Sequence, residues 1–111
     1  MKSKNISVLG GGSWGTVLAN LASRNQHNVT LWMRDSEVVE EVNKSKRNSK
    51  YLPELKLEGN INATDDISLI NDSEMVIFCI PSDSFREVSK KASEHINKSV
   101  QLVTATKGVE K

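Results

Sequence analysis

The sequence predicts an α/β fold, a doubly wound parallel sheet with helices on both faces. Short, apolar and β-branched stretches at 6–10, 29–33 and 75–80 have the composition of buried strands. The third of them lacks the alternation of a half-exposed strand, as expected when helices cover both sides of a parallel sheet. Between these stretches the apolar residues recur at helical spacing. Strands that alternate with helices predict a parallel sheet, and right-handed crossovers predict the strand order 3-2-1-4-5.

The helices follow from apolar faces and from signals at their ends. One predicted helix has an apolar face of Val17, Leu18, Leu21 and Ala22, and a second has one of Val38, Val39 and Val42. A third helix is predicted from Ser84 to His95, with Ser84 and Glu87 as a capping box and with Phe85, Val88 and Ala92 as its apolar stripe.

The remaining segments are shorter. A short strand is predicted at 61–63, a short helix from about 65 to 70, and a last strand at 100–105. The polar, basic stretch 44–50 is most simply a solvated helix end and loop. The alternative is that this stretch lies near a ligand phosphate.

Composition limits the class of protein. The chain has 111 residues, the size of one domain, and its net charge is only +1. A single cysteine excludes an internal disulfide, and no cluster of cysteine and histidine suggests a metal site. The near-zero charge and few aromatics argue against a nucleic-acid surface, and no apolar run is long enough to span a membrane. We therefore expect one cytoplasmic globular domain over 1–111.

A glycine-rich loop joins the first predicted strand to the first predicted helix. Gly10, Gly12 and Gly15 have the G-x-G-x-x-G spacing of the dinucleotide-binding loop of a Rossmann fold. The first glycine permits a tight turn, the second lets a pyrophosphate approach the backbone, and the third lets the helix pack on the strand. The N–H groups at the helix start would then face the phosphates. A glycine-rich turn without a ligand is the alternative.

The end of the second strand lies about 20 residues beyond the glycines, where a residue reads the ribose of a dinucleotide. Arg34 stands there, and its planar guanidinium suits a 2′-phosphate. The alternative is a plain surface cation. Asp35 either turns inward toward the ribose or caps the helix that begins at Ser36. The predicted cofactor is accordingly NADP or NAD.

Later strand ends border the same crevice. Lys107 follows the last predicted strand, where its charge can face a substrate phosphate or carbonyl. Position alone leaves a surface lysine equally open. Trp32 and Cys79 lie within predicted strands, so we expect a core indole and a packed thiol rather than a nucleophile.

Five motifs occur in order along almost the whole chain. They are ISVLGGGSWGT at 6–16, VTLW at 29–32 followed by Arg34, YLP at 51–53, IPS at 80–82 and ATKGVE at 105–110. Together they resemble the bacterial NAD(P)-dependent glycerol-3-phosphate dehydrogenases. That family reduces dihydroxyacetone phosphate to sn-glycerol 3-phosphate with NADH or NADPH and feeds phospholipid synthesis. The resemblance implies the same substrate pair here.

The resemblance also implies roles for single residues. By position, Ser13, Trp14, Arg34 and Tyr51 would contact the dinucleotide, as would the glycines of the loop. Lys107 would touch both the cofactor and the substrate. Met33 stands where members of the family often have a small or polar residue, and it receives no role.

Length is the main difference from that family, whose members continue into a second, helical domain. That domain supplies the proton-donating lysine and most substrate contacts, so no catalytic residue is expected within 1–111. We therefore expect this chain to be the cofactor-binding half of the enzyme and to be inactive alone. It would be either an engineered fragment or an incomplete part of a longer protein. Without the second domain, apolar surface around Phe78, Pro81 and Val103 would be partly uncovered and would favour self-association; a homodimer is an open alternative.

Two other functions stay open at this stage. One is a free-standing NAD(P)-binding sensor module without redox chemistry. The other is a related dehydrogenase with a different substrate, which would share the glycine loop but does not predict the motif at 105–110.

Overall fold

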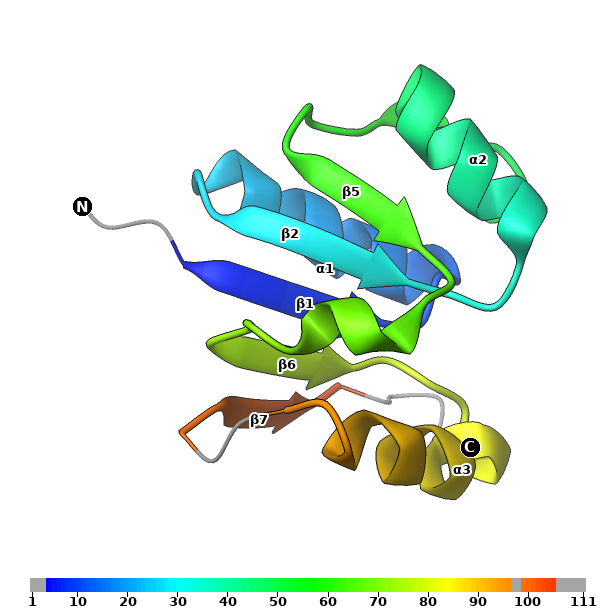
Figure 1. Cartoon of the computed structure of the whole chain (residues 1–111). Helices are drawn as coiled ribbons and strands as arrows, with labels where there is room; N and C mark the ends of the chain where they lie inside the picture. The colour runs from blue at the N-terminus through cyan, green and yellow to red at the C-terminus, as the bar shows by residue number, and fades with distance from the viewer. Residues whose placement is uncertain (1–3, 97–98, 106–111) are drawn as a thin grey trace.

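A parallel sheet forms the centre of the computed structural model, which describes residues 4–96 and 99–105 (Figure 1). Its five strands have the order β5-β2-β1-β6-β7. They are β1 (Asn5–Leu9), β2 (Asn28–Trp32), β5 (Ile61–Thr64), β6 (Met75–Phe78) and β7 (Gln101–Thr104). Every neighbouring pair is parallel. Since β5, β6 and β7 are the third, fourth and fifth strands of this sheet along the chain, the predicted order 3-2-1-4-5 is confirmed.

Helices cover both faces of the sheet. They are α1 (Ser13–Arg24), α2 (Ser36–Ser45), the short 3-10 helix η1 (Ile67–Ile70) and α3 (Ser82–Ser93). Successive strand residues point to opposite faces. Val8 and Leu31 accordingly pack in one core cluster with side chains of α1 and α2, whereas Leu9 and Trp32 pack in a second cluster with side chains of η1 and α3. The sheet is therefore doubly wound, as predicted.

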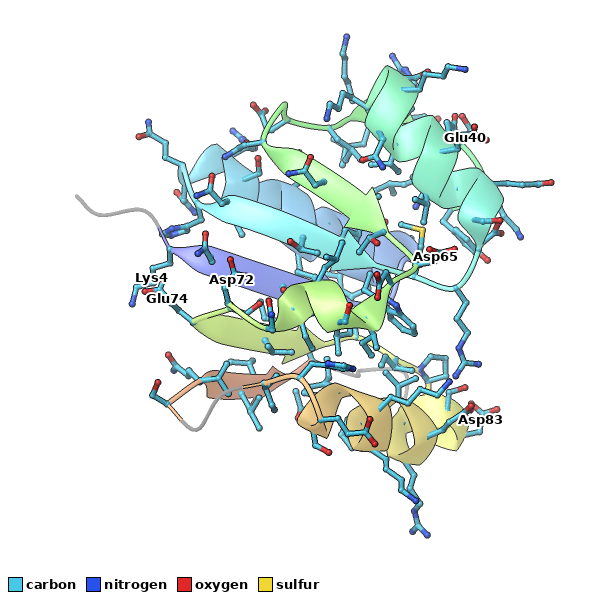
Figure 2. The ribbon with its side chains drawn as sticks, viewed as in Figure 1. Lys4, Glu40, Asp65, Asp72, Glu74 and Asp83 are labelled. Atoms are coloured by element: carbon cyan, nitrogen blue, oxygen red, sulfur yellow. The ribbon has the colours of Figure 1, made fainter. Side chains whose placement is uncertain are left out.

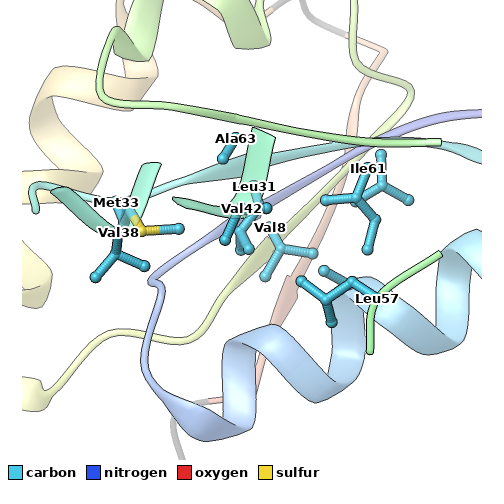
Figure 3. Packing of buried hydrophobic residues seen from close by; sticks show 10 residues of the cluster. Val8, Leu31, Met33, Val38, Val42, Leu57, Ile61 and Ala63 are labelled. Carbon is cyan, nitrogen blue, oxygen red and sulfur yellow. The ribbon is translucent and has the colours of Figure 1, made fainter. Parts of the chain in front are cut away.

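The first core cluster consists mostly of branched aliphatic side chains from the sheet, from α2 and from the loop before β5. Figure 3 shows Val8, Leu31, Ile61 and Ala63 of the sheet beside Val38 and Val42 of α2. Leu57, from the loop before β5, fills the space next to them. The predicted apolar face of α2 is thus confirmed as its buried face.

The predicted apolar face of α1 is not its buried face. The helix buries Gly15, Thr16, Ala19, Asn20 and Ser23, while Leu21 is 47% exposed. Small side chains let the helix axis approach the sheet closely, so packing against β1 and β2 selects the small face over the more apolar one.

The start of α3 also differs from the prediction. The helix begins at Ser82, with Pro81 as its N-cap residue and no side-chain cap, so the capping box of Ser84 and Glu87 is wrong. A proline before the first turn has a fixed φ and lacks an N–H, which starts the helix two residues earlier. The apolar stripe itself is confirmed, since Val88 and Ala92 are buried.

Phe78 is not uncovered, contrary to the expectation for apolar surface near the strand ends. Its side chain is 4% exposed and packs on Phe85 of α3, with ring centroids 5.4 Å apart. Pro81 is exposed and Val103 is half-buried. The apolar residue that β7 exposes is instead Leu102.

The stretch 44–50 is more than a loop. It contains β3 (Arg47–Asn48), which pairs with β4 (Leu52–Lys56) in an antiparallel hairpin outside the main sheet. Lys46, in the left-handed backbone region at φ 57°, ends α2 and turns the chain into this hairpin. Within the described residues, no helix is long and apolar enough to cross a bilayer.

Candidate dinucleotide-binding site

A cavity of about 830 Å³ lies where β1, β2 and β6 end. Strand ends of this kind border the ligand crevice of an open α/β sheet. The lining consists of the glycine loop 10–15, the end of β2 at 32–35, Tyr51, residues 79–81, 83 and 84 before and within the start of α3, Val88 and Ala105. Of the predicted site residues, the cavity brings together Gly10, Gly12, Ser13, Trp14, Gly15, Arg34 and Tyr51.

The three glycines of the G-x-G-x-x-G pattern have different roles. Gly10 has φ +123°, and a Cβ there would lie 2.1 Å from the carbonyl oxygen of Cys79. At Gly15 a Cβ would lie 1.9 Å from the carbonyl oxygen of Gly10. Both positions are closed to a side chain by backbone. At Gly12, in contrast, a Cβ would meet nothing within 4 Å, so this residue leaves open space at the cavity wall.

The positive end of the α1 helix dipole is not compensated by a side chain of its own first turn. Gly12 is its N-cap residue and provides no side-chain cap, and the first turn contains no acidic residue. The first N–H groups of a helix and its dipole attract an anion, and phosphates bind at such ends. The open space at Gly12 and this helix end therefore suit a pyrophosphate.

Asn48, which no sequence motif singles out, holds the glycine loop in place. Its side chain is fully buried, and Nδ2 donates to the carbonyl oxygen of Gly11 and to Oγ1 of Thr16, both at 2.9 Å. Oδ1 accepts from the backbone N–H of Tyr51 at 3.2 Å. The residue thus ties the β3–β4 hairpin to the loop. A polar residue within a basic stretch gives no pattern from which this role follows.

Two charged residues follow β2 and have separate partners. Nη2 of Arg34 lies 3.0 Å from Oε1 of Glu87 on α3, and both side chains are more than half exposed. Asp35 accepts from the N–H groups of Glu37 and Val38, so it caps α2 rather than turning toward a ribose. The hydrogen bond from Lys50 lowers the pKa of the Asp35 carboxyl, against a smaller opposing effect of desolvation.

Two exposed aromatic residues line the cavity. Trp14 is 49% exposed and Tyr51 is 43% exposed. The ammonium of Lys50 lies 5.4 Å from the centroid of the Tyr51 ring. Large apolar rings left open to solvent beside a cavity suit a flat heteroaromatic ligand.

Trp32 and Cys79 lie near the strand ends and line the cavity. Trp32 is in the core, as predicted, but its indole Nε1–H has no hydrogen-bond partner among the described residues, and the residue lines the cavity. Cys79 is half-buried, and burial raises the pKa of its thiol to about 11. At neutral pH this thiol stays protonated and is a poor nucleophile, in agreement with the predicted packed thiol.

One predicted site residue lies outside the described part of the chain, and other charged residues lie at both ends of the strands. Lys107 lies outside the described residues. Figure 2 shows Asp83 at the start of α3, on the side of the cavity, whereas Lys4, Asp72 and Glu74 lie at the opposite end of the strands. In the described ranges no group of His, Cys, Asp and Glu could hold a metal ion.

The open wall at Gly12, the uncapped helix end and the unpartnered indole N–H together fit a dinucleotide. With the strand order and the glycine loop, they define a Rossmann-type domain of the dinucleotide-binding class. The family model described as NAD-dependent glycerol-3-phosphate dehydrogenase N-terminus matches residues 5–111. The chain belongs to this family.

Curated relatives carry the corresponding name. The NAD(P)+ glycerol-3-phosphate dehydrogenase of Rickettsia bellii is 46% identical over 105 residues, which cover 95% of this chain and 33% of the relative. That of Neorickettsia sennetsu is 40% identical over 104 residues, 94% of this chain and 31% of the relative. The chain therefore spans about a third of the length of these relatives.

Solved structures agree with this assignment. The glycerol-3-phosphate dehydrogenase of Coxiella burnetii superposes with a TM-score of 0.86 at 28% identity, over 93% of this chain and 32% of that one. The enzyme of Plasmodium falciparum gives 0.87 at 28% identity, over 95% and 32%. Both superpositions cover nearly all of this chain and about a third of the matched chain.

Proposed function

We propose that this chain is the cofactor-binding domain of an oxidoreductase that interconverts dihydroxyacetone phosphate and sn-glycerol 3-phosphate with NAD(P)H. The observation that carries the proposal is the glycine loop, where Gly12 leaves open space in front of an uncapped helix N-terminus. The family match supports the substrate pair. The nicotinamide cofactor, when bound, supplies or accepts the hydride.

The chain's own residues would bind and orient the dinucleotide. The N–H groups after Gly12, with the hydroxyl of Ser13, would hold the pyrophosphate. Trp14 and Tyr51 would flank the ring systems, and Arg34 would face the ribose 2′-position. Lys107 would contact both cofactor and substrate. We place the proton-donating lysine outside 1–111 and the activity in a protein that contains a further helical domain.

The proposal is tested by titrating the chain with NADH and NADPH and following the fluorescence of the reduced nicotinamide. Gly12→Val should abolish binding of both, because its side chain would occupy the space of a phosphate. The variant should keep the circular dichroism of the folded chain, since a Cβ at this position meets nothing within 4 Å. A Gly12→Val chain that binds NADPH as well as the parent would refute the site.

Selectivity is tested at Arg34. Arg34→Ala should weaken NADPH more than NADH, because only NADPH carries a 2′-phosphate for the guanidinium. Loss of one charge-assisted contact corresponds to about ten- to hundredfold in Kd. Equal losses for the two cofactors would show that Arg34 does not read the 2′-position.

The broader biological setting belongs to the same proposal. It includes a cytoplasmic location, expected from the composition, and a role in phospholipid synthesis, which the family resemblance implies. It also includes self-association as a homodimer. A free-standing NAD(P) sensor is not favoured, because the matched relatives are named as dehydrogenases.

A further inference from the structure

We infer that Glu87 is a specificity-determining residue that opposes the binding of a 2′-phosphorylated dinucleotide by competing for Arg34. The inference rests on the proposed function, in which Arg34 faces the ribose 2′-position. It concerns a residue of α3 that lies outside the glycine loop and the β2 end. Three features of the Arg34–Glu87 ion pair support it, namely its position in the fold, its charged neighbours and its exposure to solvent.

The ion pair joins the two sides of the cavity. Arg34 belongs to the segment after β2, whereas Glu87 lies on α3, which follows β6. Because β1 lies between β2 and β6, the pair connects elements on either side of the strand that leads into the glycine loop. Ser84 and Val88, on the turn of α3 that also carries Glu87, line the cavity. A ligand beside Arg34 is therefore also close to the Glu87 carboxylate.

Glu87 is the carboxylate that contacts Arg34. The neighbouring Asp35 accepts hydrogen bonds at the start of α2 and from Lys50, whose Nζ lies 2.8 Å from its Oδ2. Glu87 has a second basic neighbour, Lys91, at 3.8 Å. The hydrogen bond from Arg34 lowers the pKa of the Glu87 carboxyl, which keeps it ionised at neutral pH.

A 2′-phosphate can pair with Arg34 only against this carboxylate. A phosphate monoester carries a charge of about −1.5 to −2 at pH 7, so it either displaces Glu87 or lies next to a like charge. Either arrangement costs binding free energy, and a cofactor with a 2′-hydroxyl does not incur this cost. The ion pair is more than half exposed, so it is weak enough to exchange partners. Glu87 consequently shifts the chain toward the unphosphorylated cofactor.

The test is equilibrium titration of the 111-residue chain with NADPH and NADH at low salt, comparing Glu87→Gln with Glu40→Gln. Glutamine keeps the size of the side chain and an acceptor for Arg34 but removes the charge. Glu40 is an exposed residue of α2, and Figure 2 shows it far from α3. Both variants remove one negative charge, so any general attraction for an anionic dinucleotide changes equally.

Glu87→Gln should tighten NADPH by about three- to thirtyfold, the range for removal of a like charge a few ångströms away in a partly exposed site. NADH should change less than twofold beyond the Glu40→Gln control. The gain should shrink at 0.5 M salt, because the Debye length there is roughly half of that in physiological buffer. In an Arg34→Ala background the gain should be clearly smaller, because the competition for Arg34 is absent and only the repulsion between the phosphate and the Glu87 carboxylate remains.

Three results would overturn the inference while leaving the proposed function intact. They are an unchanged or weaker affinity of Glu87→Gln for NADPH, an equal gain for both cofactors, and a gain of undiminished size without Arg34. If the parent chain binds neither cofactor, the proposed function fails and this inference fails with it. Circular dichroism of each variant confirms that the chain is folded.

Discussion

At the scale of single residues, the glycine loop depends on the side-chain amide of Asn48, which lies 37 residues beyond Gly11 along the chain. Asn48 forms hydrogen bonds with Gly11, Thr16 and Tyr51, of which that with Thr16 is buried and the other two are partly buried. Thr16 in turn donates to the carbonyl oxygen of Gly12 at 2.8 Å. Loop shape and the position of Tyr51 are therefore coupled through one buried side chain.

Replacement of Asn48 tests this coupling. Asn48→Ala removes the hydrogen bond to the Tyr51 N–H and the shorter of two hydrogen bonds to the Gly11 carbonyl, which keeps only that from Thr16 Oγ1 at 3.3 Å. The loss should lower the free energy of unfolding by about 1–3 kcal/mol. Cofactor affinity should fall as well, because the loop loses its support. The measurements are urea unfolding and NADH titration. Asn60→Ala is the matched control, since Asn60 also bonds to backbone, at Ser23 and His27, but does not touch the loop.

If Asn48→Ala loses stability and keeps the parent Kd for NADH, the residue is structural and does not shape the site. If Asn60→Ala lowers affinity equally, the loss is a general effect of destabilisation.

At the scale of elements, the sequence predicted most of the features that depend on periodicity. The strand positions, the apolar faces of α2 and α3, and the order of the sheet follow from runs of apolar residues and from handedness rules, and all are present. One error lies where a tertiary contact decides, because close packing on the sheet selects the small face of α1. The other is local, because Pro81 starts α3 earlier than the predicted capping box.

The β3–β4 hairpin shows a second limit of local patterns. Its strands are short and its sequence is polar, so neither alternation nor an apolar run marks it. It exists because Asn48 and Leu57 are buried against the rest of the fold. For the same reason the sequence located Tyr51 only through the family resemblance and did not identify Asn48.

The start of α2 carries an element-scale prediction. Asp35→Asn keeps an N-cap acceptor but removes the ion pair with Lys50, whereas Asp35→Ala removes both. Since asparagine caps as well as aspartate and exposed ion pairs contribute little, Asp35→Ala should lower the Tm clearly more than Asp35→Asn. Thermal unfolding followed by circular dichroism measures the difference. Equal losses would assign the effect to the ion pair.

The pH dependence has a defined sign. Because the pKa of Asp35 in the folded chain is below its ordinary value of 3.8, its contribution to stability is present above that value. It is lost as the pH falls from 3.8 through the lower pKa of the folded state. The advantage of the parent over Asp35→Asn should therefore disappear at the acid end of this range.

At the scale of the whole molecule, the chain spans about a third of the relatives that it matches. Carbonyl reduction needs a proton donor beside the developing alkoxide and a substrate held in line with the nicotinamide. The described cavity has the features of a cofactor site, and in the proposed function the proton-donating lysine lies outside 1–111. We therefore expect binding without turnover from residues 1–111 alone.

A chimera tests this division of labour. Replacing the matching first third of the Rickettsia bellii relative, which is 46% identical, by this chain should give an enzyme that oxidises NADPH with dihydroxyacetone phosphate. The isolated chain should bind NADPH under the same conditions and show no oxidation above background. In the chimera, Lys107→Ala should lower kcat strongly, because a cation near the substrate phosphate or carbonyl would be lost. Titration with NADH shows whether each form still binds cofactor. Turnover by the isolated chain would refute the need for a further domain, and an unaffected Lys107→Ala chimera would remove Lys107 from the site.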